Sequence, residues 1–267
     1  LPRFQPIEAL KPFFVIVVSL ILSLDKKHLY LKYLLSTIIL IPTVILLLSQ
    51  PDLGQTLLIT SVWLAIIFVS GINLVLFSFC LITICSLTFY LIFLVPKFEY
   101  IKIRLISFLD TSGKNSYQAD KASDAISSGG FFGKGIGEGT LNSRIPEAHT
   151  DYIMSVIAEE FGVIVVVSII LLYLIFSYRI LKKLNFTNNN NIKIILVGCV
   201  TLIIVQTFIH IGVNIRMLPT TGMTMPFLSY GGSSIISTSI LTGIILNLTK
   251  RKLIWMKNLI IITGGSG

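Results

Sequence analysis

The chain has 267 residues, of which 54% are apolar and only 12% are charged, and its mean hydropathy is +0.89. Soluble domains carry roughly 25% charged residues, so this composition excludes a soluble globule. The net charge of +9 comes largely from basic residues placed between apolar runs, which is typical of membrane topology and argues against a nucleic-acid-binding surface.

Seven apolar runs approach the length of about 20 residues that a helix needs to cross a bilayer. The third and fourth are separate spans because Gly71 and Asn73 favour a tight reversal between them. The sequence therefore predicts an all-α polytopic membrane protein with about seven transmembrane helices. In chain order they lie near residues 9–24, 31–49, 54–70, 72–95, 152–176, 192–212 and 229–248.

Basic residues in the loops predict the orientation of these spans, because short cytoplasmic loops are rich in Lys and Arg. If the spans alternate in direction, the loops after the first, fifth and seventh spans are cytoplasmic. The long loop 96–151 is then extracytoplasmic, and its balanced charges indicate a solvated segment. The basic residues that define the cytoplasmic side are Lys26, Lys27, Lys32, Arg179, Lys182, Lys183, Lys193, Lys250, Arg251, Lys252 and Lys257.

A glycine-rich stretch occupies residues 127–139 of the long loop (SSGGFFGKGIGEG). Two interpretations stay open: a flexible re-entrant or surface loop, or a segment whose backbone approaches a substrate closely. A nucleotide-binding P-loop is not favoured, because no strand precedes the stretch.

Three polar groups, Glu147, His149 and Asp151, lie within five residues ahead of the fifth span. They could hold a hard divalent cation or handle a substrate hydroxyl. We expect Thr150 to cap the helix that follows, and we expect the positive helix end to lower the pKa of Asp151. The alternative is an acidic residue at a helix start that takes part in no chemistry.

Ionisable and polar side chains also occur inside the apolar runs, where they are costly to bury. Glu8 and Lys11 share one helix face and can form an ion pair. Glu159 and Glu160 lie deeper in the predicted fifth span, which suggests a polar cavity between helices. Gln206, His210 and Asn214 form one stripe along the sixth span, and this stripe is either a functional surface or hydrogen-bonding contact between helices.

Several of these segments closely resemble the signature of the SEDS family, the FtsW/RodA/SpoVE group. They are residues 4–11, 50–54 (QPDLG), 146–151 (PEAHTD), 158–162 (AEEFG) and 218–234 (LPTTGMTMPFLSYGGSS). The resemblance covers residues 1 to about 250 and implies ten spans with both ends in the cytoplasm. The seven spans here would be the fourth to the tenth, and we expect the first three to be missing from this chain.

The resemblance implies a peptidoglycan glycosyltransferase that polymerises lipid II into glycan strands outside the bacterial cytoplasmic membrane. Each step would release undecaprenyl pyrophosphate with inversion at the anomeric carbon. Thr220 and Thr224 favour the division-type branch of the family, and therefore a place at the division septum. Intramembrane carboxylates leave a lipid II flippase as an alternative, and a scaffold for the division machinery as a third.

Asp151 matches the essential aspartate of the family, and we expect it to act on the acceptor hydroxyl. It could also share a divalent cation, Mg²⁺ or Mn²⁺; no organic cofactor is expected. The leaving pyrophosphate needs cationic groups, for which the extracytoplasmic candidates are Lys11, Arg104, Lys114 and Arg216. Further candidates for substrate binding or support are Glu8, Glu147, His149, Glu159, Glu160, His210, Ser229, Gly231, Gly232 and Ser233.

The family resemblance also implies partners and boundaries. The expected partners are lipid II, a class B penicillin-binding transpeptidase, other divisome membrane proteins and membrane lipids, with no nucleic acid. Residues 1–250 would form a partial SEDS transmembrane domain that includes the loop 96–151. Residues 251–267 would be a cytoplasmic tail, whose last part resembles the beginning of the glycosyltransferase MurG and is excluded from the fold.

Overall fold

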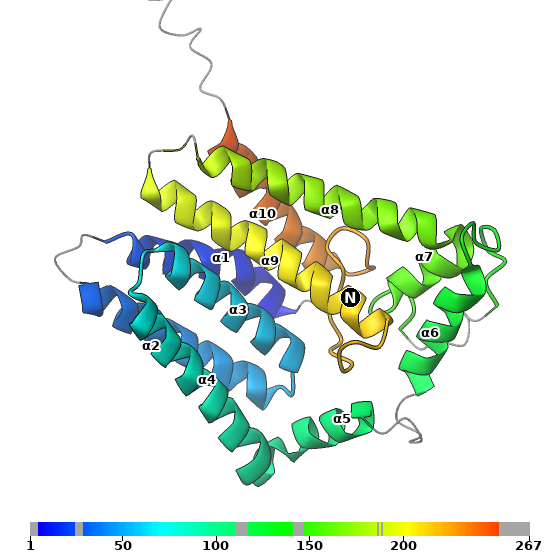
Figure 1. The fold of residues 1–267 in the computed structure, drawn as a ribbon, viewed down its shortest axis with the longest axis horizontal. Coiled ribbons are helices and arrows are strands. Elements are labelled where there is room, and N and C mark those ends of the chain that lie inside the picture. Colours follow the sequence, from blue (N-terminus) through cyan, green and yellow to red (C-terminus); the bar gives the residue numbers. More distant parts are fainter. Residues whose placement is uncertain are drawn as a thin grey trace, which may run out of the picture.

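The computed structural model describes residues 5–24, 29–109, 117–140, 147–185, 187 and 189–250. In these residues the regular structure is helical and contains no strand (Figure 1). The elements are α1 Pro6–Leu22, α2 Leu29–Ser49, α3 Leu53–Val69, α4 Leu74–Leu94, the 3-10 helix η2 Pro96–Phe98, α5 Glu99–Leu109, α6 Tyr117–Gly129, α7 Ile153–Phe161, α8 Val163–Leu184, α9 Asn190–Asn214 and α10 Gly232–Thr249.

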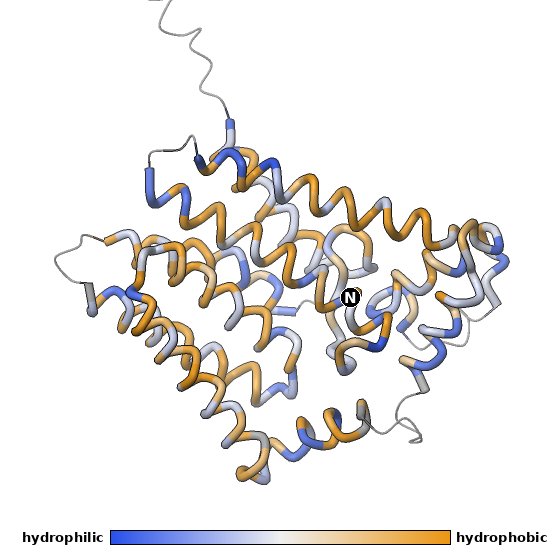
Figure 2. The backbone as a smooth tube through the Cα atoms, viewed as in Figure 1, coloured by the Kyte–Doolittle hydropathy of each residue, from blue (hydrophilic) through white to orange (hydrophobic). Residues whose placement is uncertain are grey.

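Five helices, α2, α4, α8, α9 and α10, are long and apolar enough to cross a membrane. Figure 2 shows apolar residues along most of their length. The prediction of an all-α multi-pass membrane protein is therefore confirmed. Helices α1 and α3 have 17 residues each and fall below this length, so the count of seven spans and their orientation stay predictions.

Helix α9 lies at the centre of the bundle and packs against α1, α3, α8 and α10 (Figure 1). Gly198 permits this close packing, because a Cβ there would lie 2.7 Å from Val15 Cγ1 and 2.8 Å from Ile66 Cδ1. Because α9 is central, its polar stripe lies against the neighbouring helices. In α4, by contrast, no residue of the apolar window is buried within the chain.

The prediction of one helix over residues 152–176 was wrong, because the chain breaks at Gly162 into α7 and α8. Gly162 has φ +83°, and a Cβ at this position would lie 2.2 Å from the carbonyl oxygen of Phe131. Across this contact, the backbone N–H of Val163 donates to Gly130 O at 3.0 Å. Apolar periodicity continues through the break, so the pattern alone did not reveal it.

The long loop is more structured than the sequence indicated, since η2, α5 and α6 lie within it. Its glycine-rich stretch packs on the end of α7: a Cβ on Gly133 would lie 2.1 Å from Glu160 O, and the N–H of Lys134 donates to Glu159 O at 2.9 Å. These glycines do allow a close backbone approach. The backbone that they approach is α7, so neither open interpretation describes the stretch fully.

Some predictions lie outside the described residues. They concern Lys114, Pro146 at the start of the PEAHTD text, and the tail 251–267 with its resemblance to MurG.

Candidate active site

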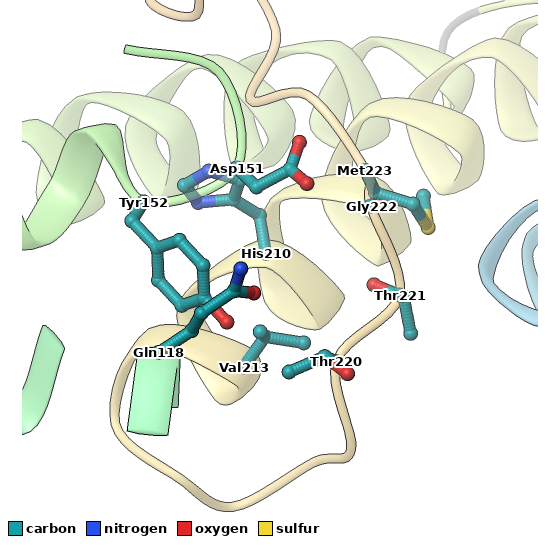
Figure 3. Close-up of a pocket in the computed structure, with 9 residues that line it drawn as sticks. All are labelled: Gln118, Asp151, Tyr152, His210, Val213, Thr220, Thr221, Gly222 and Met223. Carbon is teal, nitrogen blue, oxygen red and sulfur yellow. The ribbon is translucent and has the colours of Figure 1, made fainter. Parts of the chain in front are cut away.

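A small hollow lies between α6, the start of α7, α9 and the non-helical segment 220–223 (Figure 3). Figure 3 shows the Asp151 carboxylate directed toward Gly222, where a Cβ would lie 3.7 Å from Asp151 Oδ2. Among the described residues that line it, Asp151 is the one acidic residue, and none is Lys or Arg. The lining residues are Gln118, Asp151, Tyr152, His210, Val213, Thr220, Thr221, Gly222 and Met223.

The backbone that carries Asp151 is held by three donors from distant segments. The carbonyls of residues 149, 150 and 151 accept, in order, from the N–H of Tyr230 at 2.9 Å, the hydroxyl of Ser229 at 2.6 Å and the side-chain amide of Asn214 at 3.1 Å. We call these three contacts the carbonyl clamp. Because each donor comes from α9 or the segment before α10, the clamp fixes the carboxylate relative to the bundle.

Asn214 is fully buried and its amide orientation is determined by its partners. Its Oδ1 accepts from the backbone N–H of Ser155 at 3.1 Å and from the Ser155 hydroxyl at 2.8 Å. A backbone N–H can only donate, so the oxygen must lie on that side. The amide nitrogen donates to His210 O at 2.8 Å, and it lies 3.4 Å from His210 Nδ1.

The electrostatic setting of Asp151 differs from the prediction. Burial raises its pKa from 3.8 to about 6, and the negative charges of Glu147 and, more weakly, Asp52 add to the rise. The expected lowering was wrong, because loss of hydration outweighs the helix end. A carboxylate with a pKa near 6 is a stronger base than an ordinary aspartate and remains mostly ionised at neutral pH.

The helix begins later than the sequence predicted. Tyr152 is the N-cap of α7 and makes no side-chain capping bond. Thr150 instead donates its hydroxyl to Glu147 O at 3.1 Å and to Glu147 Oε2 at 3.0 Å. Asp151 therefore precedes the N-cap, in a turn where its own N–H donates to Glu147 O at 3.0 Å.

The three polar groups of this turn do not gather into a metal site. Glu147 and His149 are exposed, and in the part of the chain that the structure describes no three side chains of His, Cys, Asp or Glu are placed to hold a metal ion. Of the two possibilities that the sequence left open for these groups, a three-ligand cation site is therefore not formed among the described residues. Asp151 could contribute one oxygen ligand, so a cation bound jointly with substrate remains a proposal.

The predicted ion pair of Glu8 and Lys11 is confirmed, with 2.7 Å between Lys11 Nζ and Glu8 Oε1. Both side chains are buried in a polar network, in which Lys11 also donates to Gln206 Oε1 at 3.2 Å and Gln55 Nε2 donates to Glu8 Oε1 at 3.0 Å. Gln206 in turn donates to Thr224 O at 2.8 Å. Lys11 thus supports the segment behind the hollow and does not line the hollow itself.

The QPDLG text forms the turn between α2 and α3. Asp52 is the N-cap of α3 and accepts from the N–H of Gln55 at 3.0 Å. A Cβ on Gly54 would lie 2.6 Å from Met223 Sδ and 2.7 Å from Thr221 Cβ. The turn is therefore pressed against the segment that forms one wall of the hollow.

Arg104 and Arg216, two more of the predicted cations, are not among the lining residues of the hollow either. Arg216 forms an ion pair with Asp120 on α6, and its backbone has φ +58°. Arg104 lies on α5, close enough for its charge to act on Asp52. Their role toward a pyrophosphate stays a prediction.

Glu159 and Glu160 belong to the packed contact between α7 and the glycine-rich stretch. Glu159 is fully buried; its carboxylate accepts from Lys134 Nζ at 2.9 Å and from the N–H of Thr140 at 3.1 Å. Glu160 is half-buried beside it, and its carbonyl accepts from the N–H of Gly135 at 3.0 Å. Neither glutamate is among the lining residues of the hollow, and a polar cavity between membrane helices stays a prediction.

Of the SYGGSS text, Ser229 contributes to the carbonyl clamp, whereas Gly231, Gly232 and Ser233 do not line the hollow. Gly231 is the N-cap of α10 with an extended backbone. Ser234, which the sequence did not single out, bonds to the hydroxyl of Thr224 at 2.8 Å.

Sequence reasoning also missed Gln118, Tyr152 and Gly222 in the lining. Tyr152 follows Asp151 directly, which was a usable signal. Gln118 lies in a polar loop helix, and nothing in its neighbourhood of the sequence pointed to the hollow.

Comparisons with known proteins identify the family of this chain. A family described as cell cycle protein (FtsW/RodA/SpoVE) matches residues 2–253. The "Probable peptidoglycan glycosyltransferase FtsW" of Caulobacter vibrioides is 34% identical over 259 residues, which is 93% of this chain and 63% of that protein. The protein of the same name from Geobacter metallireducens is 32% identical, over 93% of this chain and 68% of its own length.

Solved structures agree as well. A chain of a peptidoglycan synthase complex superposes with a TM-score of 0.75 at 27% identity, covering 94% of this chain and 71% of that chain. Rod shape determining protein RodA of Thermus thermophilus superposes with a TM-score of 0.59 at 25% identity, covering 91% and 64%. Since the family match extends from residue 2 to residue 253, the chain belongs to the FtsW/RodA/SpoVE family.

Proposed function

We propose that this chain forms the catalytic part of a division-type peptidoglycan glycosyltransferase that polymerises lipid II. One observation carries the proposal: a carboxylate, with its pKa raised to about 6, is clamped over a hollow lined by two of the family's motifs, residues 146–151 and 218–234. The names of the Caulobacter and Geobacter relatives support the same activity. The chain spans 63% of the length of the first of them, so the proposal concerns the protein to which this chain belongs.

In the proposed reaction, the acceptor sugar hydroxyl attacks the anomeric carbon of a lipid-pyrophosphate-linked glycan. The new bond joins the hydroxyl oxygen to that carbon, and the bond from the carbon to the pyrophosphate oxygen breaks with inversion. Asp151 accepts the hydroxyl proton, and undecaprenyl pyrophosphate leaves with the bonding electrons. A pKa of about 6 suits this role at neutral pH, because the carboxylate is ionised yet basic enough to take the proton.

The leaving pyrophosphate requires positive charge that the lining of the hollow does not supply. Arg104 and Arg216, together with Lys114 outside the described residues, remain the proposed cationic groups. A divalent cation, Mg²⁺ or Mn²⁺, would neutralise the pyrophosphate when bound. Asp151 is the lining residue able to contribute an oxygen ligand to it.

We place the protein in the bacterial cytoplasmic membrane at the division septum, with a class B penicillin-binding transpeptidase and other divisome proteins as partners. One structural relative comes from a peptidoglycan synthase complex that coordinates polymerisation and crosslinking, which supports a transpeptidase partner. A lipid II flippase is less well supported than the sequence suggested, since Glu159 pairs with Lys134 in a packed loop unit and not along a path through the spans.

The decisive experiment uses the full-length protein with its transpeptidase partner, fluorescent lipid II and a divalent cation, with products resolved as glycan ladders. Asp151→Asn should abolish the ladders, whereas Asp124→Asn, a control in the exposed pair with Lys121, should not. Absence of ladders from every variant, together with lipid II scrambling in liposomes, would replace the polymerase by the flippase. Normal division by an Asp151→Asn strain would indicate a scaffold.

The pH dependence gives a second test of the same role. The rate should rise with pH through an apparent pKa near 6, because the base must be ionised. Glu147→Gln removes the nearest negative charge and should move this limb to lower pH while polymerisation persists. A limb that stays in place would show that Asp151 is not the titrating base.

A further inference from the structure

We propose that the glycine-rich stretch carries a membrane anchor: the side chains of Phe131, Phe132 and Ile136 enter the interfacial layer of the bilayer at the level where α8 begins. We call these three residues the apolar tip. Its partner is the lipid surface itself. The proposal requires only that α8 crosses the membrane, and it is independent of the proposed reaction.

The exposed apolar side chains of this region gather at one end. Among the described side chains of α6, the glycine-rich stretch and α7, four large apolar ones are exposed: Phe131 at 73%, Phe132 at 85%, Ile136 at 79% and Phe161 at 40%. Phe161 is the last residue of α7 and directly precedes the break before α8. Large apolar side chains that gather on the surface mark contact with a membrane or with another protein.

Backbone contacts place the apolar tip beside the first turn of α8. The N–H of Val163 donates to Gly130 O at 3.0 Å, and the N–H of Ile164 donates to Phe131 O at 3.4 Å. A Cβ on Gly162 would lie 2.2 Å from the same Phe131 oxygen. Figure 1 shows α6 and α7 at this end of α8. The tip therefore lies at the depth of the start of the span.

The length of α8 relates this depth to the bilayer. Its 22 residues extend over about 33 Å, against a hydrocarbon core of about 30 Å. Lys182 and Lys183 lie in its last turn, and lysines at the end of a span reach the polar interface. Val163 at the other end consequently lies near the opposite interface. Only 11% of the apolar window of α8 is buried within the chain, so the tip adjoins a surface that is available to lipid.

The glycines let the chain come close to lipid with its polar backbone satisfied. The N–H groups of residues 133, 134 and 135 donate to the carbonyls of Gly129, Glu159 and Glu160 at 2.8, 2.9 and 3.0 Å. A Cβ on Gly133 would lie 2.1 Å from Glu160 O, which shows how closely the stretch is packed on α7. Unsatisfied N–H groups are costly near hydrocarbon, and these bonds remove that cost while they hold the tip in place.

The charges of the stretch favour an apolar contact over recognition of a lipid headgroup. Lys134 is its one cation, and its Nζ pairs with the buried Glu159 carboxylate at 2.9 Å. Glu138 is exposed and adds a negative charge, which gives no attraction to anionic lipids. Phe and Ile, by contrast, are stabilised at the boundary between headgroups and acyl chains. The expected contact is therefore independent of anionic lipid.

Spin-label depth measurements on the full-length protein test the anchor. The native cysteines are replaced by serine, and one nitroxide is attached at a time through Phe132→Cys, Asp124→Cys or Leu172→Cys in phosphatidylcholine liposomes. Asp124 on α6 is 57% exposed and serves as the water control, whereas Leu172 near the middle of α8 is 66% exposed and serves as the hydrocarbon control. The ratio of accessibility to oxygen over accessibility to a water-soluble nickel complex reports the depth of each label.

The ratio at residue 132 should be several-fold higher than at residue 124 and lower than at residue 172, with or without added phosphatidylglycerol. A ratio equal to that at residue 124 would show that the tip lies in water and would overturn the proposal. Low accessibility to both reagents would overturn it as well, because protein then covers the tip. A ratio that rises only with phosphatidylglycerol would replace the apolar anchor by headgroup recognition.

A second label separates the effect of the phenylalanines from that of the label. With the nitroxide at Ile136→Cys, Phe131→Ser together with Phe132→Ser should lower the ratio several-fold toward the value at residue 124. Phe131→Leu with Phe132→Leu should keep it. An unchanged ratio in the serine pair would show that the phenylalanines do not anchor the stretch. If the serine pair fails to fold, as its thermal unfolding in detergent would reveal, the reading at residue 132 decides alone.

Discussion

Replacing Asp151 by Asn should stabilise the fold at neutral pH while it removes activity. The pKa of the carboxyl rises from 3.8 to about 6 on folding. At about 1.4 kcal/mol for each tenfold change in the protonation equilibrium, this interval corresponds to an upper estimate of about 3 kcal/mol. The sign follows from proton binding: between these values the folded state binds more protons than the unfolded state, so stability falls as pH rises through the window.

The isosteric amide has no charge to bury and escapes this loss. The free energy of unfolding should therefore be nearly equal for wild type and Asp151→Asn at pH 4. As the pH rises through 6, the variant should become increasingly more stable than wild type, and the difference should then reach a plateau. The measurement is unfolding in detergent micelles from pH 4 to pH 8. Asp124→Asn serves as a control because Asp124 is 57% exposed. A variant less stable than wild type at pH 7, or a gain independent of pH, would refute the reasoning.

Three further perturbations follow from the packing. Gly133→Ala should destabilise the fold by several kcal/mol and Gly137→Ala by about 1–2 kcal/mol. Both glycines have positive φ, but only at Gly133 would a Cβ meet another backbone, 2.1 Å from Glu160 O. Thermal unfolding measures the difference between the two variants. Lys11→Met should cost about 3–5 kcal/mol by leaving Glu8 buried and unpaired, and adding Glu8→Gln should recover much of it in a double-mutant cycle. Asn214→Ala should lower the free energy of unfolding by about 1–3 kcal/mol, since it leaves buried hydrogen-bond partners unsatisfied, and it should lower kcat as well. A lowered kcat without any loss of stability would contradict a positioning role.

The helices were predictable where a single apolar run decided them. Composition and run length located α2, α4, α9 and α10 to within a few residues, because a membrane helix satisfies its own backbone and needs no partner to form. The break at Gly162 was not predictable in this way. It depends on contact with Phe131, which is remote in the sequence, and a lone glycine in an apolar run is also compatible with an unbroken helix.

The site was predictable in its central residue and not in its surroundings. Asp151 stood out by its place beside Glu147 in a motif. The direction in which its pKa shifts depends instead on burial, and on the start of α7 two residues after Asp151. For Lys11, the spacing on one helix face correctly indicated the pair with Glu8. It could not reveal that Gln206 joins this network, outside the lining of the hollow. Tertiary contacts determined both outcomes.

The carbonyl clamp has a consequence for the biosynthesis of this protein. Its donors at Asn214 and Ser229 are translated 63 and 79 residues after the carbonyls that they bind. When the turn that carries Asp151 leaves the ribosome, none of its anchors exists, and the carboxylate has no fixed place. The hollow forms around it only once α9 and the segment leading to α10 have been inserted, so the candidate site is among the last parts of this chain to mature.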